Sequence, residues 1–394
     1  MSASGGWLRL TALAASAVTL LAVVSGTAGL GATHRVLAAL ALPPLAALVL
    51  AGRFARPALF RPALVALMLF GLAALVTQHE LHVALAALAF AATCVVSALT
   101  FRGEHVAAGT WRDYVTLTKP RIMTLLLLTG ACGYVIGAGG IPSLGGFAAT
   151  MVGLALACGG ASALNHVLDA DIDRVMGKRT ASRPVAAGRI EAGRALEFGL
   201  TLSAASFVLL ASAVNVLTAV LALAGNLFYV LVYTRWLKRS TPQNIVIGGA
   251  AGAVPPLVGW AAATGDLTVP ALFLFLIVFF WTPPHFWALA LLIRRDYESA
   301  RIPMLPVVRG ERATTRQIVL YSAALVPITL LPFFWDTVGV LYLVCAVALG
   351  GVLMALAVGL ARRTTPARAR LLFHFSLLYL ALLFVVMALD PLVA

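Results

Sequence analysis

The sequence has little charge. Only 11% of its 394 residues are Asp, Glu, Lys or Arg, whereas 62% are hydrophobic. This balance excludes a soluble enzyme held by a single membrane anchor. Runs of about 20 apolar residues, the length that a helix needs to cross a bilayer, recur along the whole chain. Gly and Pro number 34 and 19, which suits helices that are broken around a cavity. The composition predicts an all-α integral membrane protein.

The sequence also has few cysteines, and none lies in a metal-binding pattern. All four lie inside apolar runs, and no two have the CxxC spacing: Cys94, Cys132, Cys158 and Cys345. We interpret them as small hydrophobic residues.

We expect four membrane spans before residue 101 and nine after it. The first four lie at about 10–31, 36–51, 58–77 and 80–100. The nine lie at about 122–140, 144–166, 194–213, 215–234, 244–264, 269–292, 316–334, 337–361 and 370–391. Residues 1–104 are therefore predicted to form an N-terminal four-helix membrane extension of unknown role, and residues 105–394 a nine-helix domain.

The 23 Lys and Arg residues after residue 100 fall in five clusters, one in every second connection between the nine spans. The first cluster includes Arg102 and Lys119, and the intervening connections contain no cation. By the positive-inside rule the five clusters face the cytoplasm and the C-terminus lies outside. The formal net charge of +14 is then a consequence of topology and of a candidate anion site. We expect no nucleic-acid partner, and a multi-pass protein of a bacterial plasma membrane surrounded by lipid.

The carboxylates gather on the cytoplasmic side of this topology. Asn165, Asp169 and Asp173 are spaced i, i+4, i+8, which places them on one face of a helix. Magnesium takes oxygen ligands, commonly one or two carboxylates together with substrate phosphates. These three side chains are predicted metal ligands. An acidic helix end that pairs with a basic loop only to fix topology is the alternative. Asp171 points off this face.

The basic residues that follow the motif are predicted to bind the anion. Lys178, Arg179 and Arg183 come directly after Asp173, and Lys and Arg side chains bind phosphate oxygens. An acidic face beside a basic loop at a membrane edge is the arrangement that holds a magnesium diphosphate. Departure of the diphosphate would leave an allylic cation in a cavity that excludes water.

This combination resembles the intramembrane prenyltransferases of the UbiA superfamily. The resemblance rests on NxxxDxxxD followed by Lys-Arg-Thr-Ala-Ser-Arg-Pro at 178–184. It implies a nine-helix bundle around a central cavity, Mg2+ and an isoprenoid diphosphate donor.

Two further stretches are similar to one branch of that superfamily, the protoheme IX farnesyltransferases (heme O synthases). In one, at 233–256, a short basic loop meets a Gly- and Pro-rich helix start, which attracts anions; a topogenic loop with tight helix packing is the alternative. The other stretch covers 281–308. The resemblance spans about residues 111–392, including Asp113 and Thr118-Lys119-Pro120-Arg121 at its start.

The tandem prolines Pro283 and Pro284 are expected to break a span near its cytoplasmic end. His285 in that break, flanked by Trp281 and Trp287, is a candidate contact to a flat aromatic acceptor. A hydrogen-bonded structural histidine is the alternative.

The resemblance to heme O synthases implies a complete reaction and a set of sites. Farnesyl diphosphate would donate its farnesyl group to the vinyl group of protoheme IX (heme B, a substrate rather than a cofactor), giving heme O and diphosphate. Catalytic and metal-holding roles would belong to Asn165, Asp169, Asp173 and Asp296. Substrate-binding roles would belong to Lys178, Arg179, Arg183, Tyr233, Lys238, Arg239, His285 and Tyr297. A heme A synthase or cytochrome oxidase assembly would be candidate partners.

Arg301 stands where that family usually has Gly, before Ile302-Pro303. The resemblance therefore does not fix the geometry of this turn, although it still assigns the stretch. Two other functions are compatible with parts of the sequence. One is a prenyltransferase acting on a quinone precursor, which the 233–249 and 282–308 stretches disfavour. The other is a transporter for a lipid diphosphate or heme, which the absence of a visible inverted repeat disfavours.

The N-terminal extension lies outside this family pattern. His34, His79 and His82 lie at the outer side by the alternation of the spans. Two imidazoles at one level of a four-helix bundle can ligate a heme, and the stretch weakly resembles half of a heme A synthase. A packing bundle with interfacial histidines is the preferred interpretation.

Overall fold

The computed structural model describes residues 3–27, 31–54, 57–76, 79–100, 109–140 and 143–393, and these residues form helices and turns with no β-strand. The boundary that we expect at residue 104 lies outside the described residues, as does Arg102 of the first cation cluster. Four N-terminal helices form a bundle: α1 (Ala3–Thr27), α2 (Gly31–Phe54), α3 (Pro57–Leu75) and α4 (His79–Thr100).

The remaining long helices correspond one for one to the nine predicted spans, within a few residues at most ends. They are α6 (Pro120–Ala138), α7 (Leu144–Leu168), α10 (Ala192–Ala213), α11 (Val216–Leu227) continued by the π-helix η1 (Phe228–Leu237) and α12 (Lys238–Ser240), α13 (Asn244–Gly252) continued by α14 (Val254–Thr264), α15 (Val269–Leu292), α18 (Gly310–Phe334), α19 (Val340–Arg362) and α20 (Pro366–Val393).

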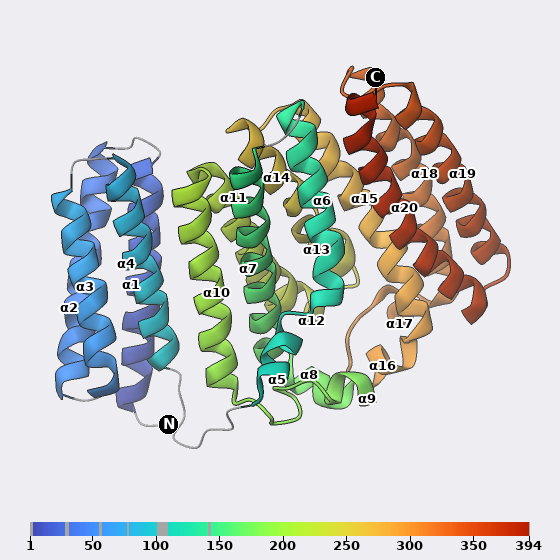
Figure 1. Cartoon of the computed structure of the whole chain (residues 1–394). Helices are drawn as coiled ribbons and strands as arrows, with labels where there is room; N and C mark the ends of the chain where they lie inside the picture. The colour runs from blue at the N-terminus through green and yellow to red at the C-terminus, as the bar shows by residue number, and fades with distance from the viewer. Residues whose placement is uncertain are drawn as a thin grey trace.

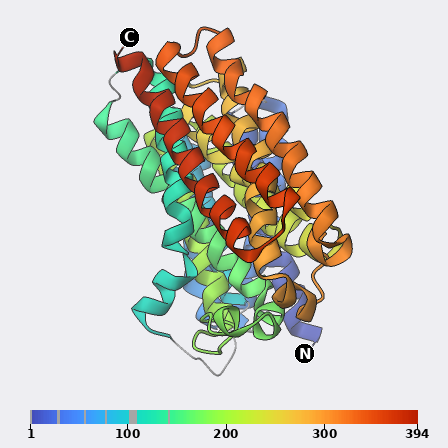
Figure 2. The ribbon, with the colours of Figure 1, turned by 90° about the vertical axis from the view of Figure 1, so that its right-hand side faces the viewer.

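Five short helices lie between the long ones. They are α5 (Trp111–Leu117), α8 (Ala170–Val175), α9 (Lys178–Ala181), α16 (Arg294–Ser299) and α17 (Leu305–Val308). Figure 1 shows α5, α8, α9 and α16 together at the end of the molecule opposite the C-terminus. The view in Figure 2 places the same segments at that end again. The cation clusters and the acidic motifs therefore gather at one end, as the charge alternation predicts.

The protein is an all-α, multi-pass membrane protein. Eleven helical stretches of the described chain are long and apolar enough to cross a membrane, and α3 and α4 contain the shorter apolar segments Leu59–Leu75 and Leu85–Ser97. Large apolar side chains such as Leu75, Leu144 and Phe334 point away from the protein. Such outward apolar faces suit contact with lipid tails rather than water.

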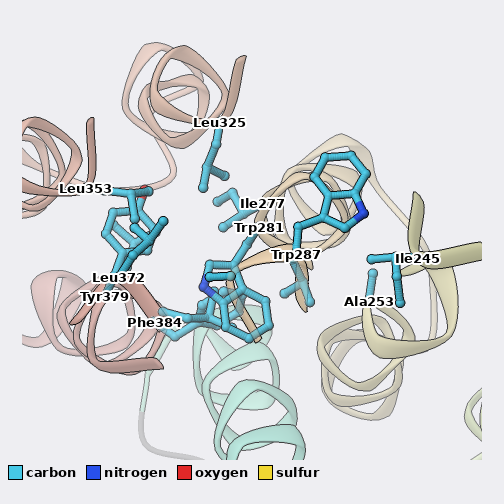
Figure 3. Close-up of a cluster of buried hydrophobic side chains, with 14 of the residues drawn as sticks. Ile245, Ala253, Ile277, Trp281, Trp287, Leu325, Leu353, Leu372, Tyr379 and Phe384 are labelled. Carbon is cyan, nitrogen blue, oxygen red and sulfur yellow. The ribbon is translucent and has the colours of Figure 1, made fainter. Parts of the chain in front are cut away.

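The C-terminal half has a continuous apolar core between α15, α18, α19 and α20. Figure 3 shows Trp281 and Ile277 of α15 on the side of the core residues of α18, α19 and α20, among them Leu325, Leu353 and Phe384. The Trp281 indole Nε1 donates a hydrogen bond to the Ser376 carbonyl of α20 at 2.7 Å, so its one polar atom is satisfied inside the core.

Glycine allows two of the helices to approach closely. α6 and α14 cross where a Cβ at Gly259 would overlap the Gly130 carbonyl oxygen, and a Cβ at Gly133 would overlap the Pro256 carbonyl oxygen. Small residues at helix crossings are what packing in a membrane favours, since backbones in contact gain van der Waals attraction.

Two predicted breaks differ from the structure. The connection expected near 235–243 is helical to Ser240, because Lys238 and Arg239 make ion pairs with Asp169 and Asp171 that hold this turn against the bundle. α15 also continues through Pro283 and Pro284. A buried transmembrane helix tolerates proline where neighbouring helices pack around it.

Candidate active site

The acidic motif forms a bend at the end of α7. The helix ends at Leu168, and Asp169 is both its C-terminal cap and the residue before α8. The i to i+4 hydrogen bonds nevertheless continue from Asn165 through Asp169 to Asp173, at 2.9 and 2.8 Å. The motif is therefore not one uninterrupted helix, but the three side chains still lie on one side of the bend, and all three are at least 97% buried.

Asn165 is the centre of a hydrogen-bond network that joins α7, the start of α6 and η1. Its Oδ1 accepts from Lys119 Nζ at 2.7 Å, and its Nδ2 donates to Asp169 Oδ2 at 2.8 Å and to Thr234 Oγ1 at 3.1 Å. Lys119 immediately precedes α6, and Thr234 lies in η1. The amide therefore has a fixed orientation, with its oxygen toward a cation and its nitrogen toward a carboxylate.

Each buried carboxylate is paired through only one of its oxygens. Lys238 Nζ lies 2.5 Å from Asp169 Oδ2, and Arg183 Nη1 lies 2.6 Å from Asp173 Oδ1. The other two oxygens, Asp169 Oδ1 and Asp173 Oδ2, are buried and have no hydrogen-bond partner among the described residues. A buried carboxylate oxygen without a partner is costly, so the site has unused capacity for a positive ligand.

These free oxygens fit a divalent cation. The described residues contain no group of three His, Cys, Asp or Glu side chains close enough to hold a metal ion by themselves. Mg2+ does not need such a group, because it usually takes one or two carboxylates and completes its shell with substrate phosphates and water. Asp169 Oδ1 and Asp173 Oδ2 are the oxygens available for it.

The predicted anion-binding cations separate into two groups. Arg183 lies against Asp173, whereas Lys178 and Arg179 on α9 lie farther out, with Arg179 exposed. Arg239 makes a two-fold contact with Asp171, with both distances 2.7 Å, and a further bond to the Leu168 carbonyl. This pairing agrees with the prediction that Asp171 points off the Asn165 face.

A second ion pair fixes the loop that carries Arg183. Arg189 Nε donates to Asp113 Oδ1 at 2.7 Å, and Arg189 Nη2 donates to the Ser182 carbonyl at 3.0 Å. Hydrogen bonds from the Thr110 backbone and from Arg189 lower the pKa of Asp113 to about 2. The carboxylate is therefore charged at neutral pH and ties the loop to α5.

The second acidic stretch lies against the turn that follows the first. A Cβ at Gly177, the turn between α8 and α9, would lie 3.2 Å from the Asp296 carboxylate. Ser299 Oγ donates to the Val175 carbonyl at 3.2 Å, and burial raises the pKa of Tyr297 to about 12. Tyr297 is therefore a neutral hydroxyl at this junction. Arg301 follows with φ 53°, the left-handed conformation that glycine adopts without strain.

The π-helix η1 brings two more polar groups to the site. Thr234 Oγ1 accepts from Asn165 and donates to the Tyr229 carbonyl at 2.9 Å. The Tyr233 ring stacks on Tyr229 at 5.5 Å and lies against Gly248, where a Cβ would overlap it. π-helical turns are frequent at functional sites because they reorient side chains within a helix.

His285 is enclosed within the protein. Its ring stacks between Trp281 at 4.4 Å and Phe373 at 4.7 Å, and its Nδ1 lies 2.8 Å from Ser376 Oγ. Both faces of the imidazole are covered, so it has no free face for a flat acceptor. Its Nδ1 is used by Ser376, so a contact to a substrate would have to use the Nε2 edge.

The site contains two residues for which the sequence predicts no role in binding or catalysis. Lys119 precedes a proline at the start of a span, and Thr234 ends a predicted span; in the sequence neither is distinguishable from a boundary residue. Burial, with the nearby cation Arg183, lowers the pKa of Lys119 to about 7.

A pocket of about 230 Å³ opens beside the motif. Its lining residues are Asp171, Ile172, Val175, Arg239, Ala300, Arg301 and Ile302.

Comparison with known proteins gives consistent matches to the nine-helix part of the chain. A family model described as the UbiA prenyltransferase family matches residues 126–383. A protoheme IX farnesyltransferase of Symbiobacterium thermophilum is 57% identical over 281 residues, which are 71% of this chain and 94% of that protein. A protein of the same name from Thermus thermophilus is 50% identical over 73% of this chain, but the match spans only 48% of its length.

Solved structures share the fold at low identity. A digeranylgeranylglyceryl phosphate synthase aligns with a TM-score of 0.61 and 18% identity over 72% of this chain and 99% of its own. A UbiA homologue from Archaeoglobus fulgidus, solved with DMAPP and Mg2+, aligns with a TM-score of 0.51 and 19% identity over 70% of this chain and 99% of its own. The residues that the family model matches begin after the N-terminal bundle of this chain.

Proposed function

The chain belongs to the UbiA prenyltransferase family, and on that premise we propose that it transfers the farnesyl group of farnesyl diphosphate to the vinyl group of protoheme IX, giving heme O and diphosphate. The observation that carries the diphosphate half of this proposal is the pair of free oxygens at Asp169 and Asp173. Arg183 and Lys238 pair with the other oxygens of these carboxylates, and Lys119 donates to the neighbouring Asn165. The acceptor is supported by the curated relatives, which are named protoheme IX farnesyltransferases.

Asn165, Asp169 and Asp173 are assigned to hold Mg2+ and the donor, with Asp296 contributing from the facing helix. Bound there, Mg2+ neutralises negative charge on the diphosphate and so favours breakage of the C–O bond. Asp169 Oδ1 and Asp173 Oδ2, which are buried without a hydrogen-bond partner among the described residues, are the oxygens that would hold it. Asn165 holds the Asp169 carboxylate in place through its Nδ2.

The three inner cations are assigned to the diphosphate oxygens. Lys119, Arg183 and Lys238 each contact a member of the acidic motif. The N–H groups of these side chains that are not used in the motif would bind the diphosphate oxygens and offset the charge that develops as the anion leaves. Lys178, Arg179 and Arg239 lie farther out, and we assign them to the diphosphate or to the heme propionates.

The remaining steps follow from the chemistry of an allylic cation. The C–O bond of the donor breaks, and the vinyl carbon of protoheme attacks the farnesyl cation to form a C–C bond. Water captures the new cation beside the porphyrin and loses a proton, which leaves a hydroxyl group. Tyr233 and Tyr297 are assigned to line this space, and His285 to contact or orient the porphyrin through its Nε2 edge.

The test is a product analysis with a matched pair of carboxylates. Membranes containing the protein, protoheme, farnesyl diphosphate and Mg2+ are expected to yield farnesylated heme by extraction and mass spectrometry. Asp169→Ala should abolish the product, because it removes a buried ligand oxygen. Asp171→Ala, which removes an exposed ion pair from the same bend, should keep most of it.

Unmodified heme in all samples, with the protein folded, would disprove the proposed acceptor. Prenylation of an added quinone precursor instead of heme would move the protein to a different branch of the same family.

We further assign the catalytic end to the cytoplasmic side of a bacterial plasma membrane and residues 105–394 to the catalytic domain. The support is the position of the cation clusters, which lie at the same end as the motif. Cysteine labelling of an exposed site such as Ser299, in intact cells and in inverted vesicles, tests the orientation. Labelling only in inverted vesicles is expected.

A further inference from the structure

The N-terminal bundle holds a second cluster of chemically active side chains, at the end opposite the acidic motif. His34 lies in the first turn of α2, and His82 lies in the first turn of α4. Figure 1 shows the chain entering α1 at the lower end, which also carries α8 and α16. The starts of α2 and α4 are therefore at the upper end, a full helix length from the prenyl-transfer site.

The two rings face each other across the bundle. Their centroids are 5.7 Å apart and their planes meet at 72°, so they are not stacked face to face. Each ring uses its Nδ1 in the same way: His34 Nδ1 lies 2.8 Å from the Ala22 carbonyl, and His82 Nδ1 lies 2.8 Å from the Ala73 carbonyl. A carbonyl can only accept, so both rings carry their proton on Nδ1.

This arrangement prepares both imidazoles as metal ligands. A proton on Nδ1 leaves the lone pair on Nε2, and a backbone carbonyl that holds Nδ1–H is the usual outer partner of a metal-ligating histidine. No hydrogen bond to either Nε2 is seen among the residues that the structure describes. Gly26 makes room for one ring, since a Cβ there would lie 2.8 Å from His34 Cε1 and Nδ1.

The number of ligands points to the kind of metal. A bare transition ion in a protein usually takes three or four protein ligands, but the described residues contain no group of three such side chains. The side chain of His79, the third histidine of this end, lies outside the described residues. A porphyrin supplies four ligands itself and leaves two axial positions, which two imidazoles fill.

The spacing agrees with axial ligation. Two imidazoles on opposite sides of one metal, each about 2 Å from it, have ring centres about 6 Å apart, close to the observed 5.7 Å. We propose that His34 and His82 are the two axial ligands of a heme held in the N-terminal bundle, separate from any heme that the prenyl-transfer site takes as substrate. Four-helix bundles hold cofactors between facing helices in this way.

The experiment uses the full-length protein, purified in detergent without farnesyl diphosphate and titrated with hemin. Absorption spectra and electron paramagnetic resonance should show a six-coordinate, low-spin heme. His34→Ala and His82→Ala should each lose this signal and weaken heme retention by about tenfold or more. His374→Ala is the matched control, because its Nδ1 also lies 2.8 Å from a backbone carbonyl but its ring neighbour is Phe373.

A second variant separates ligation from folding. His82→Met keeps an axial ligand, so it should keep a six-coordinate heme and raise its reduction potential, since methionine favours the reduced iron. A packing histidine would produce no such change.

The proposal is overturned if the wild type shows no low-spin heme, or if both alanine variants keep it. It is also overturned if Zn2+ or Cu2+ binds tightly at the histidines while hemin does not. Asp169→Ala should leave the signal intact, so the loss of prenyl transfer in that variant does not bear on this site.

Discussion

At the residue scale, the protonation of Lys119 couples the acidic motif to pH. Burial and the charge of Arg183 lower its pKa to about 7, well below the usual range of a lysine. Below pH 7 the ammonium is charged and donates to Asn165; above it the group becomes neutral and the site loses one of its three inner cations.

We therefore expect kcat/KM for the prenyl diphosphate to fall about tenfold between pH 6 and pH 8, since a group with a pKa near 7 loses about nine-tenths of its charge over that interval. Lys119→Arg stays charged throughout, so its profile should lack this decline. Initial rates across the pH range test this, and a wild-type profile that is flat from pH 6 to 8 would contradict it.

Two arginines in the same connection should differ strongly in function. Arg183 contacts Asp173 at 2.6 Å, whereas Arg179 is exposed. Arg183→Ala should lower kcat/KM for the diphosphate by about 10²-fold or more, because it removes a cation from a buried site. Arg179→Ala should stay within about threefold, since an exposed charge is screened. Steady-state kinetics at about 0.15 M salt compare them, and equal losses would mean that the loop closes over the substrate.

The sequence could place these residues in one loop but not orient them. Lys178, Arg179 and Arg183 have the same chemistry and lie within six positions. Which of them turns inward depends on the contact between Arg189 and Asp113, which holds the loop against α5. These two residues are 76 positions apart in the sequence. Lys119 illustrates the same limit, because its contact with Asn165 spans 46 residues.

At the scale of elements, the helices were predictable because each is an apolar run of the length that a bilayer requires. Apart from the break expected at Pro283 and Pro284, through which α15 continues, the errors fall where polar side chains change the helix. The α7–α8 bend at Asp169, the π-helical turn at Thr234 and the extension to Ser240 all occur where side chains of the acidic motif bond to a neighbouring element. The hydrophobic periodicity of a sequence carries no information about contacts between distant side chains. The bend, the π-helical turn and the helix extension therefore could not be predicted from it.

The crossing of α6 and α14 should be intolerant of added volume. A Cβ at Gly259 would overlap the Gly130 carbonyl oxygen, which is backbone and cannot move aside. Gly259→Ala should therefore destabilise the protein by about 1–3 kcal/mol, seen as a lower Tm of the purified protein in detergent. Gly351→Ala in α19, where nothing lies within 4 Å, is the control and should leave the Tm unchanged or slightly raised. A Gly259→Ala Tm equal to that of the control would refute the close crossing.

At the scale of the whole molecule, the N-terminal bundle and the nine-helix domain share an apolar contact. α4 packs on α10, and Phe90 meets Phe207 edge to face at 5.5 Å. The contact cluster also includes Leu154 and Leu210 on the domain side. Lipid tails can cover these apolar surfaces nearly as well as the partner helices do, because association within a membrane gains little from the hydrophobic effect.

Prenyl transfer should therefore not require the bundle. The Symbiobacterium relative matches this chain over 94% of its own length but over only 71% of this chain, and every residue assigned to the prenyl-transfer site lies at or after Lys119. A chain that begins at residue 109 should keep farnesyl transfer within about threefold of the full-length protein in membranes. Its Tm in detergent should fall, because Phe207 and Leu210 lose their partners and detergent packs less well than α4.

Product analysis and thermal unfolding of both forms separate the two effects. The full chain with His34→Ala and His82→Ala is the control for heme binding. A folded truncated chain without product, beside an active double variant, would show that the bundle supports catalysis by its packing. Loss of product in the double variant as well would show that its heme takes part in the reaction.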